Sequence, residues 1–167
     1  MQVEKAELRD GGETFERYRV LRQDASAVLL VDTQRDKVIL TRQYRYPVAA
    51  SSDEEILEIV AGKLDAGELP ADAAIREAEE ETGYRISEEQ LRFLTSCFSS
   101  PGYTTEQFHI FVATVSDADR ISRGGGLEEE HEKIALIEMD VAEFRESVRN
   151  GKIRDAKTII AGLLSEI

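Results

Sequence analysis

The sequence has little cysteine, proline or tryptophan, with one, three and none of these residues among its 167. A single cysteine, Cys97, cannot form a disulfide within the chain and fits a reducing compartment, so we expect a cytoplasmic protein. No apolar run approaches the roughly 20 residues of a transmembrane helix, and no signal-peptide pattern opens the chain. These absences argue against a disulfide-stabilised secreted protein and against a membrane partner.

Positive charge is also scarce, since 21 Lys and Arg face 34 Asp and Glu, for a net charge of −13. Binding to nucleic acid requires Lys and Arg to neutralise phosphates, so we expect no nucleic-acid partner. A phosphorylated small ligand would need local arginines, a bound cation, or both. The chain length and a hydrophobic fraction of 41% are those of one globular domain with a substantial core.

The chain shows two parts, with no internal repeat or low-complexity linker between them. Residues 1–24 are polar, and the alternation over 15–21 predicts N-terminal strands or a dimerisation arm. Residues 25–167 carry the apolar runs of a core. Further strands are expected at 27–31, 38–47, 56–60, 93–98, 108–115 and 134–139.

Three helices are expected in the second part. The first covers 71–82, with Pro70 in its first turn and Gly83 as a left-handed cap. The second runs from Asp140, which forms a capping-box-like pair with Glu143, to about Asn150. The third begins near Asp155. Strands interleaved with few helices predict an α+β fold with a mixed sheet flanked by helices.

Carboxylates crowd the segment 62–84, which holds seven of them. On a helical wheel Glu77, Glu80 and Glu81 fall at i, i+3 and i+4, on one face. Like charges at this spacing repel one another unless a cation lies among them. An all-oxygen site suits Mg²⁺, Mn²⁺ or Ca²⁺ rather than zinc. The alternative interpretation is a solvated acidic helix face.

The same segment resembles the Nudix box of the Nudix hydrolases at every fixed position, although Ala78 is smaller than the apolar residue usual there. The matching residues are Gly62, Glu68, Arg76, Glu77, Glu80, Glu81 and Gly83. This resemblance implies an α/β/α sandwich with a mixed β-sheet, formed by residues 25–167 as a Nudix catalytic domain. It also implies a loop–helix–loop that binds Mg²⁺, or Mn²⁺, and hydrolyses a nucleoside diphosphate linked to another group.

The resemblance assigns roles within the box. Glu77, Glu80 and Glu81 would hold the metal together with the backbone carbonyl of Ala61. Four residues would support the box structurally, with Arg76 making charge-assisted bonds to a carboxylate: Gly62, Glu68, Arg76 and Gly83.

Outside the box, the chain resembles ADP-ribose and GDP-mannose pyrophosphatases along nearly its whole length. The similar segments are the Glu-x-x-Ala-Gly sequence that leads into Gly62, an arginine-bearing strand, a proline loop after residue 98 and the tail 151–158. An exposed arginine on a strand is as often a solubilising residue. The implied substrate-binding residues are Arg42, Arg45, Glu58, Pro101 and Lys157, with Glu58 also a candidate for contact with the cation.

A run of three glycines at 124–126 precedes an acidic segment. In the branch that this chain resembles, a glutamate here acts as general base on water, and the alignment favours Glu130, with Glu132 second. The alternative is a solvated loop, and nothing in the resemblance supports His131 as the base.

The expected function is Mg²⁺-dependent hydrolysis of a nucleoside diphosphate sugar to a nucleoside monophosphate and a sugar phosphate. ADP-ribose is the first candidate substrate and GDP-mannose the alternative. A pyrophosphatase of oxidised nucleotides fits less well, because its shorter architecture lacks the extra segments. A non-catalytic nucleotide- or cation-binding Nudix module is more remote, because the box is intact. The resemblance also implies a homodimer whose N-terminal strands cross to the partner.

Overall fold

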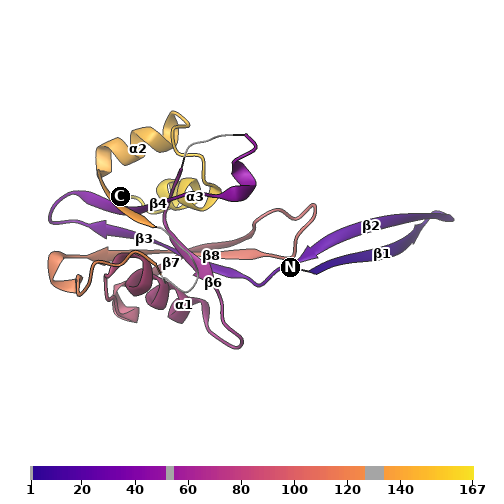
Figure 1. Ribbon diagram of the computed structural model, residues 1–167, viewed down its shortest axis with the longest axis horizontal. Coiled ribbons are helices and arrows are strands. Elements are labelled where there is room, and N and C mark those ends of the chain that lie inside the picture. Colours follow the sequence, from indigo (N-terminus) through magenta and orange to yellow (C-terminus); the bar gives the residue numbers. More distant parts are fainter. Residues whose placement is uncertain (1, 52–54, 127–133) are drawn as a thin grey trace.

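The computed structural model describes residues 2–51, 55–126 and 134–167. A two-stranded hairpin projects from a three-layered domain, in which α1 covers one face of a sheet and α2 with α3 covers the other (Figure 1). The helices are α1 (Pro70–Glu77), α2 (Val141–Arg149) and α3 (Ala156–Leu164). The strands of the domain are β3 (Ala25–Asp32), β4 (Lys37–Gln43), β5 (Ile56–Glu58), β6 (Val60–Lys63), β7 (Leu91–Phe98), β8 (Gln107–Val115) and β9 (Ala135–Asp140).

The sheet is mixed. Its described strands follow the order β5-β4-β3-β8-β7, with β6 also paired to β3 and β9 to β4. Strands β3 and β8 are parallel, whereas the other paired strands are antiparallel. The predicted α+β class, with a mixed sheet between helices and separate N-terminal strands, is therefore confirmed. None of the described helices is long and apolar enough to cross a membrane.

Strand β3 is the centre of the core, and all eight of its residues are buried. Because side chains alternate across a strand, its residues divide between the two faces of the sheet. Ala27 and Leu29 belong to the cluster that contains Phe144 of α2, whereas Val28 belongs to the cluster that contains Ala74 of α1. A strand buried on both faces appears in the sequence as a continuous apolar run, and the run at 27–31 has that form.

Two predicted strands end differently in the structure. Strand β4 stops at Gln43 rather than continuing to Pro47, because the chain turns into a short 3₁₀ helix at Tyr46–Val48. The predicted strand 56–60 is two strands, β5 and β6, which pair with β4 and β3 respectively. Between them, the Ile59 N–H donates to the Thr158 hydroxyl at 2.8 Å instead of to a strand. This hydrogen bond marks where the chain changes partners.

The predicted helix 71–82 changes its winding partway. It is α-helical to Glu77 and then forms a wider π-helical turn, Ala78–Thr82, which Gly83 ends with φ of 76°. Two glycines from a later loop donate hydrogen bonds to backbone carbonyls of this turn. Gly125 N–H donates to the Glu81 carbonyl at 2.7 Å, and Gly126 N–H donates to the Glu80 carbonyl at 3.2 Å. Turns of this kind occur often at functional sites.

The capping box expected at the second helix is absent, because Asp140 makes no side-chain cap. Its carboxylate instead accepts a hydrogen bond from the Lys37 ammonium at 2.7 Å, across the β4–β9 pair. The Asp140 side chain therefore pairs with a neighbouring strand and does not form the cap of α2 that the local sequence predicts.

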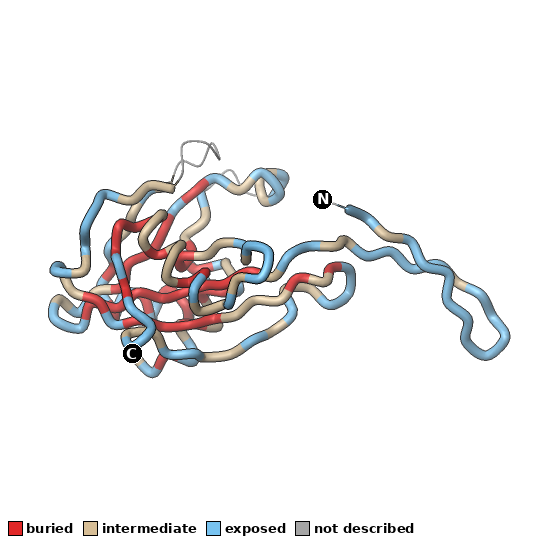
Figure 2. Tube along the Cα trace, turned by 90° about the horizontal axis from the view of Figure 1, so that it is seen from below, coloured by how far each residue is buried: buried red, intermediate tan, exposed pale blue. Residues whose placement is uncertain are grey.

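Strands β1 (Gln2–Asp10) and β2 (Glu13–Leu21) form the projecting hairpin, which we call the arm. Gly11 and Gly12 join them with φ of 56° and 88°, the two positive values that a tight two-residue hairpin turn requires. The arm extends away from the buried core and is largely exposed along its length (Figure 2). Its base is fixed to the domain by a hydrogen bond from Val20 N–H to the Tyr103 carbonyl at 2.7 Å.

Candidate active site

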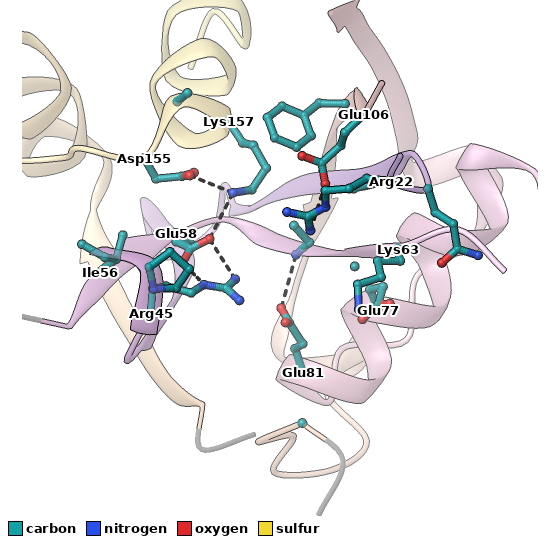
Figure 3. A pocket seen from close by; sticks show the side chains of 18 of the residues that line it. Arg22, Arg45, Ile56, Glu58, Lys63, Glu77, Glu81, Glu106, Asp155 and Lys157 are labelled. Carbon is teal, nitrogen blue, oxygen red and sulfur yellow. Dashed lines mark hydrogen bonds and ion pairs between the residues drawn. The ribbon is translucent and has the colours of Figure 1, made fainter. Parts of the chain in front are cut away.

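A cavity of about 750 Å³ opens beside the box. One wall carries box residues from β6, α1 and the π-helical turn, and the opposite wall carries side chains from β5, the loop after β4 and the start of α3 (Figure 3). The box residues at the cavity are Ala61, Gly62, Arg76, Glu77, Glu80 and Glu81. Sequence segments far apart in the chain thus face one another across one space.

The three box glutamates differ in their surroundings. Glu81 is buried, and its Oε2 accepts a hydrogen bond from Ala61 N–H at 3.3 Å. Arg76 Nη1 lies 2.7 Å from Glu77 Oε1 and 3.1 Å from Glu80 Oε2, so one guanidinium nitrogen bridges both carboxylates. Part of the repulsion that the sequence implies is therefore offset by Arg76.

Arg76 also ties the box loop to its helix. Its Nε and Nη2 donate to the two oxygens of Glu68 at 2.9 and 3.0 Å, a bidentate pair. This hydrogen bonding holds the pKa of the Glu68 carboxyl below its usual value, and Asp65 N–H adds a bond at 2.8 Å. A charged Glu68 keeps Arg76 directed at the cavity wall.

Gly62 leaves the space that the Glu77 carboxylate occupies. A Cβ atom at this position would lie 1.7 Å from Glu77 Oε1 and 1.9 Å from the carboxyl carbon. No side chain fits there unless the Glu77 carboxylate moves.

The glycine run 124–126 packs against the other end of the box. At Gly124, φ is 62° and a Cβ would lie 2.4 Å from the Glu81 carbonyl oxygen, so both conformation and space favour glycine. Gly126 itself lines the cavity. The predicted bases Glu130 and Glu132 follow it in sequence but lie outside the described residues, as does His131.

The donors at this wall fit a hard cation by their chemistry. Three carboxylates and the Ala61 carbonyl group form an all-oxygen set, which Mg²⁺ and Mn²⁺ prefer. Among residues 2–51, 55–126 and 134–167, no three acidic, histidine or cysteine side chains are gathered closely enough to coordinate a metal as they stand. One Arg76 nitrogen instead bridges two of the three carboxylates, Glu77 and Glu80.

The opposite wall is built from paired charges. Glu58 is 3% exposed, and its carboxylate accepts hydrogen bonds from Arg45 and from Lys157. Burial alone would raise the pKa of Glu58, but its bonds to Arg45 and the charge of Lys157 outweigh burial and lower it. Three of the predicted substrate-binding residues thus lie together at the cavity.

The two other predicted substrate-binding residues are not among those that line the cavity. Arg42 points to Glu55, with an N–O distance of 3.2 Å, and Pro101 lies in an exposed turn of the β7–β8 loop. Two residues that the sequence did not indicate do line it, Arg22 and Glu106, which form an ion pair at 3.2 Å. Arg22 directly follows the arm, whereas Glu106 directly precedes β8, so only the fold brings them together.

Comparison with known proteins agrees with this architecture. A GDP-mannose pyrophosphatase of Cronobacter sakazakii is 41% identical over 141 residues, which cover 83% of this chain and 71% of that protein. The methanol dehydrogenase activator of Bacillus methanolicus is 38% identical over 161 residues, or 96% of this chain and 81% of that protein. A solved structure titled "Crystal structure of ADP compounds hydrolase" shares the fold, with a TM-score of 0.76 at 24% identity over 98% of this chain and 83% of that one.

A mixed sheet between helices, with a glutamate-rich helix at a charged cavity, is the arrangement that the Nudix resemblance of the sequence implies. The NUDIX domain family matches residues 21–159, which is most of the chain, so the chain belongs to that family. It is a Nudix hydrolase related to GDP-mannose pyrophosphatases.

Gly62→Ala should displace the Glu77 carboxylate, because the new Cβ would overlap it. We expect hydrolytic activity in Mg²⁺ to fall by about 10²-fold, the scale of a misplaced catalytic group, while the protein stays folded. The matched control is Gly102→Ala, where an added Cβ meets nothing within 4 Å. Activity and thermal unfolding are measured for both variants, and wild-type activity in Gly62→Ala would contradict this role.

Proposed function

We propose that this protein hydrolyses the pyrophosphate bond of a nucleoside diphosphate sugar, with Mg²⁺ as cofactor, to give a nucleoside monophosphate and a sugar phosphate. The observation that carries the proposal is the pair of facing walls: carboxylates that suit a cation on one, and cationic side chains on the other. A diphosphate between these walls would meet positive charge on both sides. A domain this acidic needs such local compensation to accept an anion.

In this proposal Glu77, Glu80, Glu81 and the Ala61 carbonyl hold the metal. A bound Mg²⁺ would neutralise the diphosphate and lower the pKa of a coordinated water. Arg45 supplies positive charge from the other wall, and its guanidinium can pair with phosphate oxygens in a fixed geometry. Arg76 offsets the repulsion between Glu77 and Glu80 and orients them, through its contacts with both and with Glu68.

Two nucleotide sugars are candidate substrates. The sequence favours ADP-ribose, whereas two of the relatives in the comparison, from Cronobacter sakazakii and Escherichia coli (strain K12), are named GDP-mannose pyrophosphatases, at 41% and 37% identity. Because this likeness covers 83% of the chain in both cases, we place GDP-mannose beside ADP-ribose.

The experiment is release of GMP from GDP-mannose and of AMP from ADP-ribose, each with and without Mg²⁺. We expect Mg²⁺-dependent turnover of at least one, and a fall in kcat of about 10²–10³-fold for Glu81→Gln, the scale of a lost group that stabilises transition-state charge. Glu79→Gln is the control, because Glu79 pairs with Arg85 and is not among the cavity residues. Turnover of neither substrate, or an unaffected Glu81→Gln, would refute the proposal.

We further propose Glu130 as the general base that activates water, with Glu132 as the second candidate. Their support is the sequence resemblance and the place of Gly126, a few residues earlier, at the cavity wall. Glu130→Gln should lower kcat by about 10²–10⁴-fold, the usual contribution of a general base, with a smaller change in KM. If Glu132→Gln carries that loss and Glu130→Gln does not, the assignment passes to Glu132.

We propose that the protein is a cytoplasmic homodimer in which residues 1–24 act as the dimerisation arm. An isolated two-stranded hairpin is marginally stable in water, and this arm exposes Val3, Leu8 and Tyr18 at 58%, 44% and 57%. A second copy would cover these side chains. Light scattering should give twice the chain mass of 18.7 kDa, and a Val3→Glu, Leu8→Glu variant should shift toward monomer. A monomeric wild type would exclude the dimer.

A further inference from the structure

Lys157 faces the cavity but is only 8% exposed. Its Nζ lies 2.7 Å from Asp155 Oδ1, 3.0 Å from Glu58 Oε2 and 5.4 Å from the centre of the Phe108 ring. An ammonium group has three N–H donors and no acceptor, and a cation within about 6 Å of a ring centre is attracted to its face. Two carboxylates therefore accept hydrogen bonds from Lys157, and one aromatic ring attracts its charge.

Glu58 continues the chain of contacts toward the cavity. Its Oε1 accepts from Arg45 Nε at 2.6 Å, and its Oε2 accepts from Arg45 Nη2 at 3.0 Å as well as from Lys157. The four side chains thus alternate in charge, in the order Asp155, Lys157, Glu58, Arg45 (Figure 3). Alternation lets each buried charge be compensated by its neighbours.

The two ends of this series differ in how they are held. Asp155 begins α3, where its carboxylate accepts from the Thr158 N–H at 2.9 Å and from the Thr158 hydroxyl at 2.7 Å. That hydroxyl also accepts from Ile59 N–H, next to Glu58. Arg45, in contrast, lies between the end of β4 and the short 3₁₀ helix, where its carbonyl accepts from the Val48 N–H at 2.9 Å. Its side chain is 37% exposed and lines the cavity.

We propose that Lys157 and Asp155 are positioning residues, which hold Glu58 and through it place the Arg45 guanidinium for a phosphate group of the substrate. This inference rests on the proposed function, because it assumes a diphosphate in the cavity. It changes the role expected for Lys157 from direct contact with the substrate to support of a side chain that makes the contact. It also makes Glu58 the anchor of an arginine rather than a ligand of the cation.

The test is a double-mutant cycle with Arg45→Met and Lys157→Met, in which kcat and KM for the hydrolysed nucleotide sugar in Mg²⁺ are measured separately. If Lys157 acts through Arg45, Lys157→Met should raise KM about 10-fold in the wild-type background and less than about 3-fold when Arg45 is already Met. Losses that multiply in the double variant would mean that Lys157 contacts the substrate independently, and the inference would be overturned.

Glu58→Gln gives a second route that does not alter Lys157. It keeps the shape of the side chain but removes the charge that orients Arg45, so we expect a similar rise in KM, non-additive with Arg45→Met. A merely structural role would lower the thermal unfolding temperature without this coupling. Additive KM effects of Glu58→Gln and Arg45→Met would therefore overturn the inference even if Lys157→Met does not fold.

Lys152→Met is the matched control. Lys152 lies shortly before α3, its side chain is 60% exposed and its ammonium lies 3.5 Å from Glu143. It is not among the residues that line the cavity. It should leave KM unchanged. A rise in KM equal to that of Lys157→Met would show a general effect of positive charge on an anionic substrate, and would contradict positioning.

A binding measurement separates this inference from the proposed function. Calorimetry measures the Kd of the non-hydrolysable α,β-methylene ADP and of its guanosine counterpart, in Mg²⁺. The measurement is made for the wild type, Arg45→Met, Lys157→Met and the double variant. Binding by a wild type that hydrolyses no nucleotide sugar would refute the function alone, and the coupling of Arg45 to Lys157 in affinity would still decide the inference. No binding of either analogue by the wild type would overturn both.

Discussion

Repulsion among Glu77, Glu80 and Glu81 is the constraint on which the site depends. A chain with a net charge of −13 places three carboxylates at one cavity wall, and they stay there because Arg76 pairs with two of them and with Glu68. One guanidinium offsets only part of this charge. In the proposed function the remainder is available to a cation, which would let an acidic protein accept a diphosphate at its most acidic segment.

Small residues make this arrangement possible. Gly62 leaves the space that the Glu77 carboxylate fills, and Gly124 approaches the Glu81 carbonyl where a Cβ would overlap it. The glycine N–H groups that follow bond to the wider turn at the end of the box helix. On the opposite wall, acidic and basic side chains alternate, so like charges are not adjacent. Each buried charged group there has an oppositely charged group within hydrogen-bonding distance.

Sequence reasoning succeeded where the signal is local. The apolar run at 27–31 predicted a strand, which lies within β3, and the spacing of the glutamates predicted side chains that share a face and now line one wall. It failed where a distant residue decides. Ile59 leaves the strand because its N–H bonds to Thr158, and Arg22 reaches the cavity because it meets Glu106. The hydrophobic pattern around Ile59 or around Arg22 does not indicate these contacts, because each partner lies far away in the sequence.

The central claim is that the box wall is a cation site, and Mg²⁺ uptake tests it most directly. Calorimetric titration of the wild type with millimolar Mg²⁺ and α,β-methylene ADP is compared with a variant in which Glu77, Glu80 and Glu81 are all Gln. The account predicts uptake by the wild type and its loss in the variant, with both proteins folded. Equal uptake by the two proteins, or none by the wild type, would contradict it.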